Sequence, residues 1–209
     1  MRMVLNVAEE CGMDVVFSDA DNIFYQNPFE HDFGRLIEAQ RYDYIYQSNE
    51  ESPDEPLTDQ CLQGQPREEA NTGFYFMSRK SSVMKTMINS TLTTCNEPKN
   101  KIDDQTLFWL EFWKTSHAQH DANHTFHHCD VTEYLQPSTH NLQESKNAAF
   151  NFCCLDPYHY PIGQPDQPKN ADPVTYHANY VMGKDKKVEK LRNSRADHYG
   201  WNESRATLG

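Results

Sequence analysis

The sequence predicts an α/β domain. Short apolar runs rich in β-branched and aromatic residues alternate along the chain with segments whose apolar residues recur every three or four positions. Such an alternation is typical of a sheet flanked by helices. The chain has 209 residues, including eleven Phe, eleven Tyr and three Trp, which is enough apolar material for one sizeable core.

The N-terminal elements lead to an acidic segment. Residues 2–11 are expected to form a helix, because their apolar residues recur at helical spacing until Gly12 ends the pattern. The run from Met13 to Phe17 is apolar and β-rich, which predicts a buried strand. A turn is then expected at Asn27-Pro28.

Helices and strands continue to alternate over the rest of the chain. The expected elements are a helix at 33–40, a strand at 42–49, a polar loop at 50–70, a strand at 72–78, a helix at 81–93, a helix at 103–115, a loop at 116–148 with a strand near 125–134, a strand within 148–155 and a charged helix at 184–193. In the helix at 103–115, Asp103 suits the N-cap, and Leu107, Leu110 and Trp113 are predicted to form its apolar stripe.

Composition narrows the classes of function. The chain has 31 acidic and 19 basic residues and no long basic stripe, so we expect no nucleic-acid partner. No apolar run is long enough to span a membrane, and the first residues lack a signal-peptide layout, so we expect neither membrane contact nor a targeting segment in this chain. Six cysteines without CxxC spacing disfavour a zinc knuckle and leave the disulfide pairing open.

Two carboxylates stand one residue apart at the end of the first predicted strand. In an extended segment, Asp19 and Asp21 would point to the same side. Like charges this close repel each other unless a cation or a proton intervenes. Carboxylate oxygens suit Mg²⁺ or Mn²⁺, which in turn bridge phosphate oxygens. The pattern therefore indicates a divalent metal site, with a solvated turn as the alternative.

Four segments follow one another in an order that points to a known family. They are "GMDVVFSDADNIFYQNPF", "EANTGFYFMSRKS", "DDQTLFW" and "HANYVMGKDKKVEKLR". In this order they resemble the nucleotide-diphospho-sugar transferase family, which includes plant cell-wall xylosyl- and arabinosyltransferases. The resemblance covers about residues 12–192, and four ordered matches are far more specific than one.

The resemblance implies a GT-A type, Rossmann-like fold with a mixed sheet flanked by helices, in a domain at 1–194 followed by a tail at 195–209. It also implies metal-dependent transfer of a sugar from a nucleotide diphosphate, with UDP the expected nucleotide, to a hydroxyl of a glycan or glycoprotein, with retention at the anomeric carbon. Such domains normally begin with a βαβ unit that binds the base of the nucleotide. Because only 18 residues precede Asp19, we expect the domain to be N-terminally truncated.

The resemblance also assigns roles to ten residues. The metal ligands would be Asp19, Asp21 and His177, the donor-binding residues Asn71, Thr72, Gly73, Gly183 and Lys184, and the residues beside the reacting carbon Asp104 and Gln105. An imidazole among the ligands favours Mn²⁺ over Mg²⁺. Structural roles remain open as well: Asp104 could be only a first-turn acid, and His177 only a hydrogen-bonded structural histidine. Asn71-Thr72-Gly73 could be only a turn that opens a strand, and Lys184 only the start of a solvated helix.

The cellular setting follows from the same resemblance and from three N-glycosylation sequons, at Asn89, Asn123 and Asn202. Together they lead us to expect that the full-length protein is a glycoprotein of the Golgi lumen.

Two other functions remain as alternatives. The stretch "VVFSDADNIF" superficially matches the DxD of haloacid-dehalogenase-type phosphatases, but Asn22 stands where those enzymes usually have Thr or Val. Their later acidic pair also follows the lysine, whereas Asp103-Asp104 precedes Lys184 here. The second alternative is a catalytically inactive sugar- or partner-binding module of the same fold. Tight nucleotide-sugar binding without turnover would identify that module.

Overall fold

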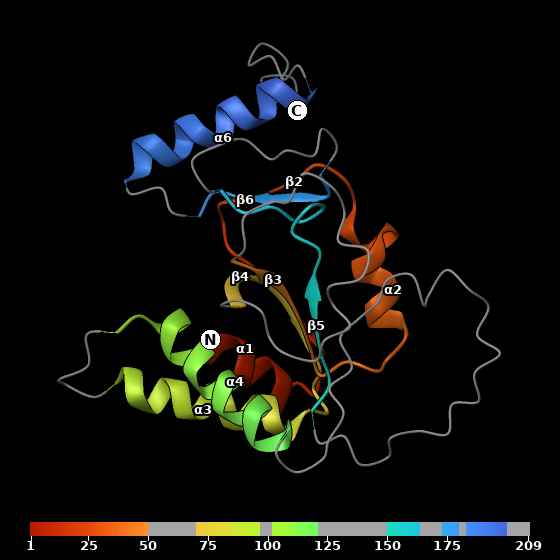
Figure 1. Cartoon of the computed structure of the whole chain (residues 1–209), viewed down its shortest axis with the longest axis vertical. Coiled ribbons are helices and arrows are strands. Elements are labelled where there is room, and N and C mark those ends of the chain that lie inside the picture. The colour runs from red at the N-terminus through yellow and green to blue at the C-terminus, as the bar shows by residue number, and fades with distance from the viewer. Residues whose placement is uncertain (50–69, 97–101, 121–149, 164–172, 180–182, 200–209) are drawn as a thin grey trace.

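The computed structural model describes residues 1–49, 70–96, 102–120, 150–163, 173–179 and 183–199 (Figure 1). The loop predicted at 50–70, apart from Ala70, and the strand predicted near 125–134 lie outside these residues.

A four-stranded mixed sheet forms the centre of the fold. Its strands, in spatial order, are β1 (Val15–Ser18), β4 (Ala70–Met77), β3 (Tyr44–Ser48) and β5 (Phe152–Leu155). Strands β1 and β3 run antiparallel to β4, and β5 runs parallel to β3. The prediction of a mixed sheet flanked by helices is confirmed, and each of these strands overlaps a predicted one.

The helices lie where the sequence predicts them, but two are longer than expected. They are α1 (Arg2–Glu10), α2 (Asp32–Glu38), α3 (Ser82–Cys95), α4 (Asp104–His120) and α6 (Lys184–Tyr199), with a 3-10 helix, η1 (Pro28–Glu30), that begins in the predicted turn. The predicted ends at 115 and 193 were too early, because the polar residues that follow include no Gly or Pro before the observed ends. Among the described residues, no helix is both long enough and apolar enough to cross a membrane.

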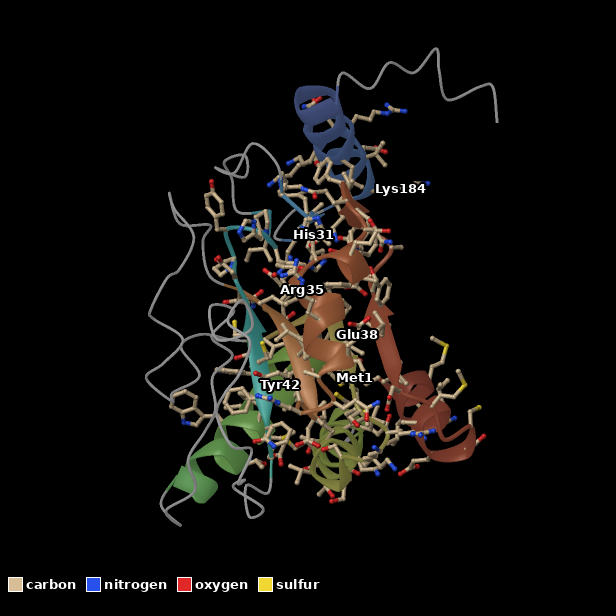
Figure 2. The ribbon with its side chains drawn as sticks, turned by 90° about the vertical axis from the view of Figure 1, so that its right-hand side faces the viewer. Met1, His31, Arg35, Glu38, Tyr42 and Lys184 are labelled. Carbon is tan, nitrogen blue, oxygen red and sulfur yellow. The ribbon has the colours of Figure 1, made fainter. Side chains whose placement is uncertain are left out.

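Helices cover both faces of the sheet, with α1, α3 and α4 on one side and α2 on the other (Figure 1). Tyr44 and Tyr46 of β3 pack in the cluster under α1, α3 and α4, whereas Ile45 packs in the cluster under α2. Successive side chains of a strand point to opposite faces, so a run of apolar residues serves both clusters. On the outer side of α2, His31, Arg35 and Glu38 are partly or fully exposed (Figure 2).

The buried face of α4 differs from the predicted stripe. Leu107 is buried as expected, but Leu110 and Trp113 are 43% and 39% exposed. Phe108 and Phe112 are buried instead, with ring centroids 5.6 and 6.0 Å from that of Tyr44. Residues four apart share a helix face, so the two phenylalanines form a stripe of their own. Aromatic packing on β3 decides which of the two stripes faces the core.

Strand β1 is half-buried, so the prediction of a buried strand is wrong. Val15 and Phe17 are partly buried, whereas Val16 is 40% exposed. The physical reason is position: β1 is the end strand in the order of the described sheet, and its burial alternates along the chain.

A second, two-stranded sheet lies at one end of the main sheet, next to α6 (Figure 1). It pairs β2 (Asn22–Phe24) with β6 (Thr175–His177) in antiparallel register. A small cluster of Ile23, Tyr176 and Ala178 forms its core, and Leu191 of α6 packs against that cluster. Neither strand was predicted. Because β2 follows β1 almost directly, this pairing brings the C-terminal part of the chain back to the acidic turn.

Candidate metal and donor site

The polar residues of the site gather at one edge of the main sheet. Since β1 and β3 both run antiparallel to β4, the carboxyl ends of β1 and β3 lie beside the beginning of β4. Asp19 directly follows β1, Asn49 directly follows β3, and Asn71 is the second residue of β4. Strand direction alone therefore brings three distant segments to one edge.

Asp19 and Asp21 belong to a tight turn between β1 and β2 rather than to an extended segment. The N–H of Asn22 donates to the carbonyl of Asp19 at 3.3 Å, which closes the turn. The backbone N–H of Asp19 and the side-chain amide of Asn22 both donate to the carbonyl of Gly73, at 2.7 and 2.8 Å. The expectation that the two carboxylates share one side because the chain is extended is thus wrong. Instead, both carboxylates lie near His177 because they belong to a turn that is hydrogen-bonded to β4.

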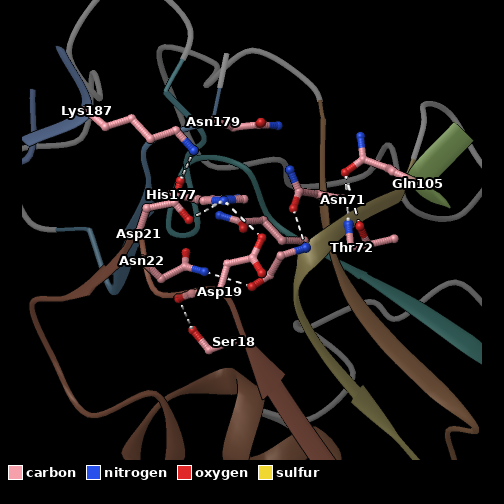
Figure 3. A network of polar contacts seen from close by, with 12 residues as sticks. Ser18, Asp19, Asp21, Asn22, Asn71, Thr72, Gln105, His177, Asn179 and Lys187 are labelled. Carbon is pink, nitrogen blue, oxygen red and sulfur yellow. Dashed lines mark hydrogen bonds and ion pairs between the residues drawn. The ribbon is translucent and has the colours of Figure 1, made fainter. Parts of the chain in front are cut away.

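His177 completes a group of three candidate metal ligands (Figure 3). It lies opposite Asn22 in the β2–β6 pairing and is only 4% exposed. Its Nε2 atom is 3.3 Å from Oδ1 of Asp21 and 3.7 Å from Oδ2 of Asp19. Its Nδ1 atom is buried and has no hydrogen-bond partner among the described residues.

Gly73 makes room for this imidazole. A Cβ atom at position 73 would lie 2.2 Å from Cε1 and 2.8 Å from Nδ1 of His177. It would also lie 2.8 Å from Oδ1 of Asn71. Carbon atoms in ordinary contact stay more than 3.4 Å apart, so only glycine fits here without moving the histidine.

The two carboxylates differ electrostatically. The hydrogen bond from His177 holds the pKa of Asp21 far below its usual range; burial opposes this effect, and the ammonium of Lys187 reinforces it. The pKa of Asp19 is raised, mainly because burial disfavours its charged form, although His177 partly opposes this. Asp21 therefore carries its negative charge at neutral pH, as a metal ligand must.

A divalent cation fits this donor set. One ligand atom from each of Asp19, Asp21 and His177 lies within 4.8 Å of the other two. Ligands bound at about 2.0–2.2 Å on opposite sides of a metal stand about 4 Å apart, so a small closure of the three side chains is enough. Two carboxylates and one imidazole form a mixed oxygen and nitrogen set of the kind that divalent transition metals accept.

Hydrogen bonds between side-chain amides connect the segments that form the site. Oδ1 of Asn49 accepts hydrogen bonds from the side-chain amides of Asn71 and Asn179, at 2.8 and 3.2 Å. Oδ1 of Asn71 in turn accepts from the N–H of Gly73 at 2.7 Å. Asn71 is fully buried and Asn49 is 4% exposed. The network ties the end of β3 and the residues after β6 to the stretch of β4 that contacts His177.

The start of α4 reaches the same edge. Oε1 of Gln105 accepts hydrogen bonds from the N–H and the hydroxyl of Thr72, at 3.2 and 3.4 Å. Asp104 is exposed at the first turn of α4, and its charge contributes to raising the pKa of Asp19. Asp103 caps the helix, since its Oδ1 accepts from the N–H of Thr106 at 2.9 Å. The adjacent aspartates therefore have different surroundings.

The helix after His177 contributes a lysine, Lys187, that no sequence motif predicts. Gly183 precedes α6 with φ of +94°, and its carbonyl accepts from the N–H of Lys187 at 3.1 Å. Lys184 is exposed and lies at the periphery of the molecule (Figure 2). Lys187, one turn later, reaches Oδ2 of Asp21 at 2.5 Å (Figure 3).

The structure thus brings most of the predicted residues to one edge of the sheet. Asp19, Asp21 and His177 form the candidate metal group, with Asn71 and Gly73 beside it and Thr72 joined to Gln105. The residues missed were Lys187, Asn49, Asn179 and Asn22. Asn49 ends a predicted strand, which is a usable signal, whereas the run "KDKK" offers no way to choose among its lysines.

Comparison with known proteins finds a match to one family model. No curated protein and no solved structure matches the chain. The model of one protein family, described as nucleotide-diphospho-sugar transferase, matches residues 1–191. This match spans the acidic turn, β4, the start of α4, β6 and the first half of α6. The chain therefore belongs to the nucleotide-diphospho-sugar transferase family.

Proposed function

We propose that this protein is a metal-dependent glycosyltransferase that moves a sugar from a nucleotide diphosphate, with UDP as the nucleotide, to an acceptor hydroxyl with retention at the anomeric carbon. The observation that carries the proposal is the convergence of Asp19, Asp21 and His177 at one sheet edge, with donor atoms within 4.8 Å of one another, in a member of this family. The same fold without this cluster would support only a nucleotide-sugar binding module.

The metal would be held by these three side chains, and Mn²⁺ is preferred over Mg²⁺ because one ligand is an imidazole. When bound, it would supply positive charge to the diphosphate that leaves the sugar. Gly183 and Lys184 would meet the diphosphate from the start of α6, where a positive φ and an exposed ammonium are available. Lys187 lies closer to the metal group and is the better placed of the two lysines.

The donor sugar would lie against Asn71, Thr72 and Gly73 at the beginning of β4. The hydrogen bonds from Thr72 to Gln105 fix the amide of that glutamine at this edge. Asp104 and Gln105 would then stand beside the reacting carbon. A retaining transfer needs a carboxylate or amide to steady an oxocarbenium-like centre and to position the acceptor, not a strong base. The expected acceptor is a glycan or glycoprotein in the Golgi lumen.

The test is a panel of UDP-sugars incubated with the protein, with and without Mn²⁺, with release of UDP as the readout. The variants are Asp19→Asn and Asp21→Asn, and Asp32→Asn in the first turn of α2 is the control with the same change of charge. Both site variants are expected to lose more than about 100-fold in rate, since loss of even an outer partner of a metal ligand costs 10–100-fold.

Three results would count against the proposal. UDP release that is equal with and without Mn²⁺ would refute the role of the metal. Binding of a UDP-sugar with no release or transfer for any donor would identify a binding module. With an active donor, proton NMR of the fresh product reads the anomeric configuration, and an inverted product would refute retention.

A further inference from the structure

Lys187 already provides a cation at the candidate metal site. Its Nζ atom is 2.5 Å from Oδ2 of Asp21, while Oδ1 of the same carboxylate faces Nε2 of His177 at 3.3 Å. Both oxygens of Asp21 therefore have a protein partner. Figure 3 shows the Lys187 side chain reaching from α6 to Asp21.

The Lys187 side chain can leave this position without moving its helix. It is 38% exposed, whereas the Asp21 side chain is 17% exposed. Helix α6 has other attachments, because Lys190 donates to the carbonyl of Gly163 at 2.8 Å and Leu191 packs against the cluster around Ile23. A lysine ammonium is a point charge on a flexible four-carbon stem, so rotation about that stem is enough to withdraw it.

We propose that Lys187 is an internal counter-ion of Asp21 that the divalent metal displaces, and that the released ammonium then binds the diphosphate. A divalent cation and an ammonium repel each other when they share one carboxylate, so the bound metal excludes Lys187 from Oδ2. The freed ammonium and the metal would then both supply positive charge to an anionic ligand. This inference rests on the proposed function and adds a coupling between metal and nucleotide binding.

Lys187 would therefore weaken the binding of the metal alone and strengthen the binding of the nucleotide. Without nucleotide, Lys187 competes with the metal and weakens its binding. With nucleotide present, Lys187 has a new partner and no longer competes. By linkage, the factor by which UDP strengthens Mn²⁺ binding equals the factor by which Mn²⁺ strengthens UDP binding. Removing the ammonium should lower both factors together.

The test uses Lys187→Met, with Lys186→Met as the matched control, because Lys186 is the exposed neighbour on the same helix and its loss changes the net charge equally. Calorimetry measures Mn²⁺ binding alone and then UDP binding at saturating Mn²⁺. We expect Lys187→Met to bind Mn²⁺ alone roughly three- to tenfold more tightly than the control, and UDP about tenfold more weakly. Lys187→Arg keeps a cation beside Asp21 and should bind Mn²⁺ no more tightly than the wild type.

Mn²⁺ binding by Lys187→Met that equals or is weaker than that of the control would overturn the displacement. A gain in Mn²⁺ affinity without a loss in UDP affinity would overturn the role at the diphosphate. If the proposed function is wrong, the result differs: neither the wild type nor any variant would bind UDP at any Mn²⁺ concentration. Tighter Mn²⁺ binding by Lys187→Met in that case would still support displacement of the lysine by a metal.

Discussion

Replacing Gly73 with alanine should remove His177 from the metal site while leaving the fold in place. Gly73 lies inside β4, and among the described glycines only Gly12 and Gly183 have a positive φ. The backbone at position 73 can therefore accept an alanine. The obstacle is the new Cβ atom, which would meet Cε1 of His177 at 2.2 Å.

The magnitude follows from this distance. Ordinary contact begins near 3.4 Å, so the imidazole must retreat by about 1.2 Å. Metal–ligand distances tolerate only about 0.2 Å, so His177 can no longer ligate. We expect Mn²⁺ binding to weaken by about 100-fold or more, since even outer-shell changes cost 10–100-fold. Crowding of this kind also costs about 1–3 kcal/mol of stability, which lowers the Tm by roughly 2–12 °C in a chain of this size.

The assay is calorimetric titration of Mn²⁺, together with a thermal melt of each metal-free sample. Gly34→Ala is the control, because a Cβ there would meet the backbone carbonyl of Phe29 at 2.0 Å, away from the metal group. The control should lose stability and keep its Mn²⁺ affinity. Wild-type Mn²⁺ affinity in a folded Gly73→Ala sample would refute the assignment of His177 as a ligand.

Three further predictions concern stability and the division of roles at the site. Asn49→Ala should lower the free energy of unfolding by about 1–3 kcal/mol in urea titrations, because two amides lose their acceptor; an unchanged value would show that the network is not needed. Asp103→Ala should cost about 1 kcal/mol by uncapping α4 and leave transfer unaffected, whereas Asp104→Asn should slow transfer and change stability by less than about 0.5 kcal/mol; the reverse result would exchange their roles. Because the pKa of Asp21 is lowered on folding, the stability it adds is fully present above the ordinary value of 3.8 and is lost as pH falls below it. The difference in unfolding free energy between wild type and Asp21→Asn should therefore be constant at neutral pH and shrink below 3.8, and a difference that persists in acid would contradict this assignment.

Local signals in the sequence were enough for most elements of the fold. The apolar run before Asp19 predicts β1, and Asp103 predicts the start of α4, because strand composition and N-caps act over a few residues. The extra length of α4 and α6 was missed because polar residues alone do not end a helix. Strands β2 and β6 were missed because each has three residues, and they pair across most of the chain.

All three residues of the candidate metal group could be predicted, since Asp19 and Asp21 follow a strand and His177 lies in a matching motif. The contacts of Lys187 and Asn49 could not, because their partners are 166 and 130 residues away in sequence. Packing of Leu191 against the β2–β6 cluster sets the rotation of α6, and this rotation selects Lys187 from several nearby lysines. No local pattern encodes that choice.

The most direct test of the central claim is calorimetric titration of UDP into the protein, with and without Mn²⁺, beside a variant carrying both Asp19→Asn and Asp21→Asn. We expect UDP to bind in the presence of Mn²⁺, to bind far more weakly without it, and not to bind to the variant. Binding that is independent of Mn²⁺, or that survives in the variant, would contradict a metal bridge between these carboxylates and a diphosphate. Absence of UDP binding under every condition would contradict binding of the nucleotide by this chain.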